Sequence, residues 1–277
     1  MTNSVKTPIS FASAILLASG WFVIGFLLLP MFVVVLASFT DQPFMSLPKE
    51  SLSTQYYKNF FSSTDWIGST LRSALVAAVS TLLAVVLGTL CTIGCWRVEG
   101  RFSVMVRLML LAPMMVPTVI EGLAMFKVWV QLGLFDTYFG LILAHTLTGI
   151  PYVLVTVSAA LARFDLRLEQ AARSLGASVP RTIIEVIIPQ IRPGIFSGAL
   201  FVFVHSFDEL VVTLFLTSRQ IVTLPKQMWS GIQENLDPTI AAVSAIIIAA
   251  TTMAIVVGRM RSSWDPSIRT STEAVAH

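Results

Sequence analysis

The chain has 277 residues, of which 55% are hydrophobic and 12% are charged, with a mean hydropathy of +0.81. Soluble domains carry about 25% charged residues, so this composition excludes an ordinary soluble domain and indicates an integral membrane protein. The formal net charge of +3 comes from basic residues in short segments rather than on one face, which argues against nucleic-acid binding.

Six apolar stretches are long enough to cross a bilayer, which requires about 20 largely apolar residues. The third is the weakest, because Glu121 and Lys127 interrupt it and Pro113 and Pro117 bend or break it. It is retained because an odd number of spans would place the charged segment that follows the fourth span on the wrong side. The predicted fold class is an all-α integral membrane protein, with spans at roughly 11–38, 69–95, 104–132, 139–162, 194–217 and 238–259.

No boundary between domains is evident along the chain, which predicts a single membrane domain over residues 1–277. The polar residues 262–277 are expected to form a flexible tail. Within the second span, Ala84, Gly88 and Gly94 are small residues at the spacing that is typical of close helix packing.

A charged segment with five arginines, residues 163–192, separates the fourth and fifth spans. Residues 166–175 are strong helix formers, and Gly176 offers the left-handed conformation that ends a helix. Ser178 is a good N-cap for a second helix, which Pro189 is expected to end. The pattern predicts two short helices joined by a sharp turn.

Within this segment, Ala171-Ala172, Gly176 and Val186-Ile187-Ile188-Pro189 resemble the EAA loop of permease subunits in binding-protein-dependent ABC importers. In that family the loop forms coupling helices that sit in a cleft of the cytoplasmic ATPase. The resemblance implies a type I ABC importer permease (MetI-like) fold with six transmembrane helices. The residues that it assigns to ATPase coupling are Glu169, Gln170, Ala171, Ala172, Gly176, Ile188 and Pro189.

This EAA loop, residues 163–192, departs from the family at one position. The family's glutamate falls on Gln170, and the glutamate of this chain stands next to it at Glu169. The sequence therefore leaves open which of the two side chains makes the polar contact with the ATPase.

The distribution of basic residues predicts that both termini and the EAA loop are cytoplasmic. With the N-terminus inside, twelve basic residues lie on the cytoplasmic side and five outside. The inner set is Lys6, Arg97, Arg101, Arg107, Arg163, Arg167, Arg173, Arg181, Arg192, Arg259, Arg261 and Arg269, and the outer set is Lys49, Lys58, Arg72, Arg219 and Lys226.

Ionisable side chains at membrane depth are costly, so they are candidates for a substrate path. Asp208 and Glu209 fall near the middle of the fifth span, and Glu121 lies in the bent third span. Phe207 and Phe215 are close enough in sequence to supply aromatic faces. Carboxylates beside aromatic rings suit an ammonium ion, through charge pairing and cation–π attraction.

Structural roles for these residues stay open. A carboxylate can bond to a neighbouring helix or cap a helix break, and Glu121 can pair with Lys127 across a bend. His145 and His205 are interpreted as hydrogen-bonded residues between helices rather than as ligands.

The stretch SFDELVVTLFLTS, followed by TLPKQMWSGIQENLDPTIAAVSA, is similar to the second permease of spermidine/putrescine-type importers. The resemblance implies an inner-membrane complex of two permeases, two copies of a P-loop ATPase and a periplasmic binding protein, with a small cationic amine as substrate. It leaves open other small solutes, such as opines and amino-acid derivatives.

The chain contains no P-loop sequence, GxxxxGK[ST], and no recognisable catalytic or metal-binding motif. We therefore expect a subunit that is not an enzyme, with ATP and Mg²⁺ bound by the partner ATPases. Two rivals remain: an ion-coupled secondary transporter with Asp208, Glu209 and Glu121 as a proton relay, and a scaffold that docks an ATPase without transporting anything.

Overall fold

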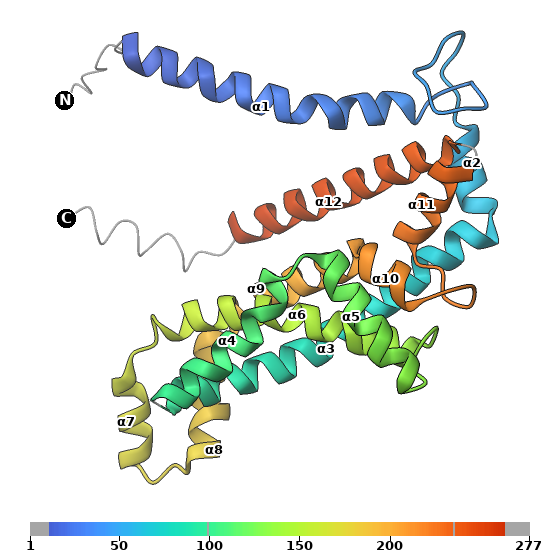
Figure 1. The fold of residues 1–277 in the computed structure, drawn as a ribbon. Helices are drawn as coiled ribbons and strands as arrows, with labels where there is room; N and C mark the ends of the chain where they lie inside the picture. Colours follow the sequence, from blue (N-terminus) through green and yellow to red (C-terminus); the bar gives the residue numbers. More distant parts are fainter. Residues whose placement is uncertain (1–10, 99, 235, 264–277) are drawn as a thin grey trace, which may run out of the picture. The chain divides into compact units, whose positions relative to one another are not determined.

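The computed structural model describes residues 11–98, 100–234 and 236–263, which form helices joined by loops (Figure 1). The helices are α1 (Phe11–Ala37), α2 (Gln55–Ser62), α3 (Thr64–Arg97), α4 (Arg101–Met115), α5 (Thr118–Gln131), α6 (Tyr138–Leu161), α7 (Leu166–Ser174), α8 (Val179–Thr182), η1 (Ile183–Ile187), α9 (Ile188–Asp208), α10 (Val211–Leu216), α11 (Leu224–Glu234) and α12 (Thr239–Ser263). Most of the predicted tail, from residue 264 onward, lies outside the described residues.

Within the described residues, four helices are long and apolar enough to cross a membrane, or five if the bent pair α4–α5 forms one span. These helices overlap the first five predicted spans, although the one at the fifth is Val179–Asp208 rather than 194–217, and the all-α membrane fold class is confirmed. The sixth predicted span coincides with α12, whose apolar stretch Thr239–Ala254 is shorter. The sixth span therefore stays a prediction.

The chain divides into two compact units: one combines the residues up to Ser63 with those from Gly231 onward, and the other is Thr64–Ser230. The single membrane domain stays a prediction. In the first unit α1 and α2 contact α12, and Asn59 Nδ2 donates to Thr239 Oγ1 at 2.8 Å. The side chains of α1 are apolar and mostly exposed, as expected for a helix that faces lipid.

The core of the second unit lies where α3, α6 and α9 pack together. Small residues allow this close approach, since a Cβ on Gly88 would lie 2.9 Å from Val153 and one on Gly149 would lie 2.7 Å from Val202. The predicted close packing of Ala84 and Gly88 is confirmed, whereas a Cβ on Gly94 would meet no described atom within 4 Å beyond the backbone of its own helix. The buried core residues are Ala84, Ile93, Ile150, Val153, Val157, Leu161, Ile187, Ile191 and Val202.

The third predicted span is bent, as its prolines indicated. α4 and α5 meet at an angle of 107°, with Pro113 inside α4 and Pro117 directly before α5. The Pro117 carbonyl accepts the N–H groups of Ile120 and Glu121, which starts α5 in a new direction. The bend places Glu121 in the first turn of α5.

Pro189 does not end the second helix of the EAA loop, contrary to the prediction. α8 continues through the π-helical turn η1 into α9, so that Val179–Asp208 is one helical run of 30 residues. In a regular α-helix a proline clashes with the carbonyl four residues before it. The π-helical turn widens the backbone just before Pro189, because the Ile188 N–H bonds to the Ile183 carbonyl five residues back.

Asp136 joins two loops of the second unit, the one between α5 and α6 and the one between α10 and α11. Its carboxylate accepts the backbone N–H groups of Ser218 at 2.9 Å and Gln220 at 3.3 Å. Burial by itself would raise the pKa of Asp136, but these backbone amides outweigh it and hold the pKa below its ordinary value of 3.8. The ionised carboxylate therefore stabilises the folded chain.

We expect Asp136→Asn to destabilise the protein by about 1 kcal/mol at neutral pH, because it weakens these hydrogen bonds. Since the pKa is lower in the folded state, the stabilisation is present above 3.8 and is lost as the pH falls below that value. The apparent melting temperature in detergent, measured from about pH 6 to about pH 3, should fall more steeply for wild type than for Asp136→Asn. Parallel curves would contradict this role.

Candidate functional site

A helix break within the predicted fifth span carries two of the candidate carboxylates. α9 ends at Asp208 and α10 begins at Val211, so the helix is interrupted within residues 194–217, as one of the roles left open for these carboxylates allows. Glu209 has an extended backbone at this point. Its Oε1 accepts the N–H of Val212 at 2.9 Å, and its carbonyl accepts the Thr213 hydroxyl at 2.9 Å. Local side-chain bonds therefore replace the helix ladder at the break.

Glu209 is buried and lies beside His205 and Tyr152. His205 Nε2 is 4.0 Å from Glu209 Oε2 and 3.2 Å from Thr148 Oγ1. The Tyr152 ring lies 4.9 Å from the His205 ring, with the hydroxyl 3.5 Å from Nδ1. Sequence reasoning missed Tyr152, which no charge or motif marks.

The second histidine, His145, belongs to a buried hydrogen-bond group next to the break. Its ring nitrogens lie 2.7 Å from Ser206 Oγ and 3.2 Å from Thr213 Oγ1, which joins α6 to α9 and α10. The interpretation of His145 and His205 as hydrogen-bonded residues between helices is confirmed.

The bend of α4–α5 brings Glu121 to the same place. α5 packs against α10, and a Cβ on Gly122 would lie 2.6 Å from the Phe215 ring. The carboxylates of Glu121 and Glu209 interact electrostatically, and both also act on Tyr152. The structure therefore places Glu121 of α5 next to α10, which carries Phe215, and within electrostatic reach of Glu209 at the helix break.

Asp208 and Phe207 occupy the edge of this group. Asp208 is exposed and acts electrostatically on His205, which links it to the same cluster. Phe207 is half-buried, and its ring stacks on Phe203 at 6.0 Å. All five predicted path residues thus surround or flank one helix break.

The EAA loop has the predicted form of two helices joined at a sharp turn. Asp165 caps α7 by accepting the Arg167 N–H at 2.9 Å, and Gly176 ends it with a φ of +88°. α7 has no buried residue, and Leu175 at the turn is 89% exposed. An exposed leucine at the tip suits a protein partner, and sequence reasoning did not single it out.

The predicted coupling residues differ in their environment. Gln170, Ala171, Gly176 and Pro189 are exposed, and Ala172 and Ile188 are half-buried. Glu169 differs from them, because its carboxylate pairs with Arg97 at the end of α3.

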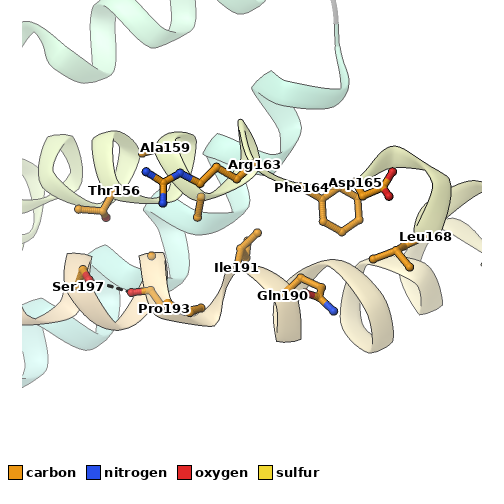
Figure 2. A pocket seen from close by; sticks show the side chains of 12 residues that line it. Thr156, Ala159, Arg163, Phe164, Asp165, Leu168, Gln190, Ile191, Pro193 and Ser197 are labelled. Atoms are coloured by element: carbon orange, nitrogen blue, oxygen red, sulfur yellow. Dashed lines mark hydrogen bonds between the residues drawn. The ribbon is translucent and has the colours of Figure 1, made fainter. Parts of the chain in front are cut away.

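A cavity of about 540 Å³ lies where the EAA loop joins the two helices that flank it. Figure 2 shows Thr156, Ala159 and Arg163, in and just after α6, on one side and Pro193 and Ser197 of α9 on the other. Asp165 and Leu168 close the end toward α7. The cavity therefore lies beside the contact between α6 and α9, which stays close where Gly194 approaches Thr156 and Ala160.

Apolar spans, a helix break with clustered carboxylates and an exposed EAA loop define a permease, the membrane-spanning subunit of an ABC importer. The sequence pattern of one family, the inner membrane component of binding-protein-dependent transport systems, matches residues 84–270. The chain belongs to this family and is a multi-pass inner-membrane protein.

Two relatives match most of the chain. The spermidine/putrescine transport system permease protein PotC of Haemophilus influenzae is 28% identical over 86% of this chain and 92% of its own length. The putrescine transport system permease protein PotI of Escherichia coli is 30% identical over 81% of this chain and 82% of its own length.

The fold also matches a solved structure. It is a bacterial ABC transporter involved in the import of the acidic polysaccharide alginate, with a TM-score of 0.64 and 15% identity. The match covers 93% of this chain and 99% of that chain, and at this identity it shows the fold alone.

Proposed function

We propose that this chain is one of two permeases in an importer of polyamines, small amines that carry several positive charges. Its partners are a second permease, two copies of a cytoplasmic P-loop ATPase that bind ATP and Mg²⁺, and a periplasmic binding protein. Both termini and the EAA loop are cytoplasmic in this arrangement. The similarity to the PotC and PotI permeases supports the substrate class.

The observation that carries this proposal is the cluster of carboxylates at the helix break. Glu121, Asp208 and Glu209 place carboxyl groups at membrane depth, where a cation loses its hydration shell. Tyr152 and Phe215 offer aromatic faces, and a cation–π contact contributes about 0.5–2 kcal/mol. A chain of ammonium groups fits such a site better than an anionic or neutral solute does.

Transport then follows from alternating access. ATP-driven closure of the ATPases displaces the EAA loop, and the helices α6 and α9, which the loop connects, move with it. The helix break opens toward the binding protein in one state and toward the cytoplasm in the other. Only a modest free-energy difference between two packings of the bundle is required.

The experiment that tests this function is uptake by proteoliposomes that contain the complete importer. Radiolabelled spermidine should accumulate only with internal ATP and with the loaded binding protein outside. Unlabelled putrescine should compete, whereas an anionic or neutral solute of similar size should not.

Two results would contradict the proposal. Uptake by this chain alone, driven by a pH gradient and indifferent to ATP, would establish a secondary transporter. ATP-dependent uptake of an anionic solute without any uptake of amines would keep the importer and overturn the substrate class.

A further inference from the structure

The one charged side chain of α7 that the sequence offered as an ATPase contact is already paired within the chain. Glu169 Oε1 lies 2.5 Å from Arg97 Nη2, and the two side chains are 14% and 23% exposed. Arg97 is in the last turn of α3 and Glu169 is in the first turn of α7. Each charge therefore has the sign that the dipole of its own helix favours.

A second contact beside this ion pair joins the same two elements. The rings of Trp96 and Phe164 meet edge to face at 5.9 Å, and Phe164 lies in the connection between α6 and α7. Two consecutive residues of α3 therefore contact the first part of the EAA loop. The end of α3 is itself fixed, because Ser103 and Arg107 of α4 both donate to the Cys95 carbonyl.

These contacts matter because they join α7 to a helix that does not adjoin the EAA loop along the chain. α7 buries none of its residues, and it also packs against α8 and η1, which begin the helical run that continues into α9. α3, in contrast, packs along α6 and α9 through the core, where Gly88 meets Val153. The ion pair and the ring contact therefore join α7 to a helix that packs in the core with α6 and α9.

We infer that Glu169 is a positioning residue that transmits movement of the EAA loop to α3 through Arg97, rather than a contact to the ATPase. The inference rests on the proposed function, in which the EAA loop docks on an ATPase. It leaves exposed residues of the loop, Gln170 and Leu175 among them, available to that partner. α3 then joins α6 and α9 as a moving helix, although the loop is connected only to α6 and α9 along the chain.

The test is a double-mutant cycle in the assembled importer, with Arg97→Ala, Glu169→Ala and the double variant. Three quantities are measured: the ATPase that copurifies, the rate of ATP hydrolysis, and the substrate taken up per ATP hydrolysed. We expect normal copurification and an uptake per ATP that falls about tenfold in each single variant, with no further loss in the double variant. Glu169→Gln keeps a hydrogen-bond acceptor for Arg97 and should therefore retain most of the uptake. Retained uptake in this variant would show that the loss in Glu169→Ala does not result from misfolding.

The chain supplies a matched control pair in the same loop. Arg181 and Glu185 form an exposed ion pair, with side chains 66% and 58% exposed, and their alanine variants should leave uptake per ATP unchanged. Leu175→Asp should instead abolish copurification of the ATPase, which separates loss of docking from loss of transmission.

Three outcomes would overturn the inference. The first is uptake per ATP at the wild-type level in Arg97→Ala and Glu169→Ala. The second is a loss in the double variant that equals the two single losses combined. Loss of ATPase copurification in Glu169→Ala alone would make Glu169 a direct contact. Failure of the proposed function looks different, since the wild-type chain would then bind no ATPase at all.

Discussion

Uptake of spermidine by the assembled importer is expected to fall about ten- to hundredfold when Asp208→Asn and Glu121→Gln are combined. Both changes keep the size and the polarity of the side chain and remove only the charge. A hydrogen bond to a charged group contributes about 1.5–3 kcal/mol, and every factor of ten corresponds to about 1.4 kcal/mol. Initial uptake rates over a range of substrate concentrations measure the loss.

Substrate binding should change more than assembly in these variants. Asp208 is exposed and Glu121 is half-buried, so neither is needed to satisfy a buried backbone group. Asp65→Asn, which neutralises an exposed carboxylate in the first turn of α3, is the matched control and should leave uptake unchanged. Full uptake by the double variant would favour a scaffold that docks an ATPase without conducting the amine.

Glu209 must be interpreted separately from the other two carboxylates. Its Oε1 accepts the Val212 N–H at the start of α10, so a loss of charge there also weakens the helix break. A fall in uptake for Glu209→Gln would therefore report on both substrate binding and local structure. This is why the prediction rests on Asp208 and Glu121.

Much of the fold could be predicted because the signals are local. Runs without charge mark the spans, Pro113 and Pro117 mark the bend of 107°, and Gly176 marks the turn of the EAA loop. Each of these features depends on the chemistry of a few neighbouring residues. The apolar composition of the spans indicates that they face lipid on average, but it does not identify which of their residues do so.

The features that sequence missed depend on partners far along the chain or on small backbone adjustments. Glu169 and Arg97 are separated by 72 positions, and nothing in either neighbourhood indicates the other. The break at Glu209 is one of several roles that the sequence leaves open for the carboxylates of this span, because a charge in a span does not by itself distinguish a helix cap from a substrate contact. Pro189 looked like a helix end because the π-helical turn that accommodates it has no sequence signal of its own.

In the candidate site, too, local chemistry could be predicted from the sequence and long-range packing could not. The carboxylates stood out because charge is expensive in a membrane, but their mutual distances depend on how α5, α9 and α10 pack. Tyr152 carries no charge at neutral pH, so only its position beside His205 and Glu209 brings it into the site. The charge of the side chains identified the candidate residues, whereas the tertiary packing of the helices determines which of them come together.

Packing of α9 on α6 gives the second large effect, a loss of stability in Gly194→Ala. A Cβ at Gly194 would lie 2.6 Å from Ala160 Cβ and 2.8 Å from the Thr156 carbonyl, and neither neighbour is the end of a flexible side chain. Overpacking of this kind costs about 1–3 kcal/mol. We expect the apparent melting temperature in detergent to fall by several degrees, at about 2–4 °C per kcal/mol for a chain of this size.

Gly94→Ala is the matched control, because it makes the same change where no described atom beyond the backbone of its own helix lies within 4 Å of the new Cβ. Alanine is favoured over glycine inside a helix by up to about 1 kcal/mol, so this variant should melt at the same temperature as wild type or higher. A lower melting temperature for Gly194→Ala and an unchanged or higher one for Gly94→Ala would show that the close approach of α6 and α9, rather than helix propensity, limits the side chain at position 194. Equal shifts in both variants would mean that α9 can move away from α6 at little cost, and the close approach would then contribute nothing to stability.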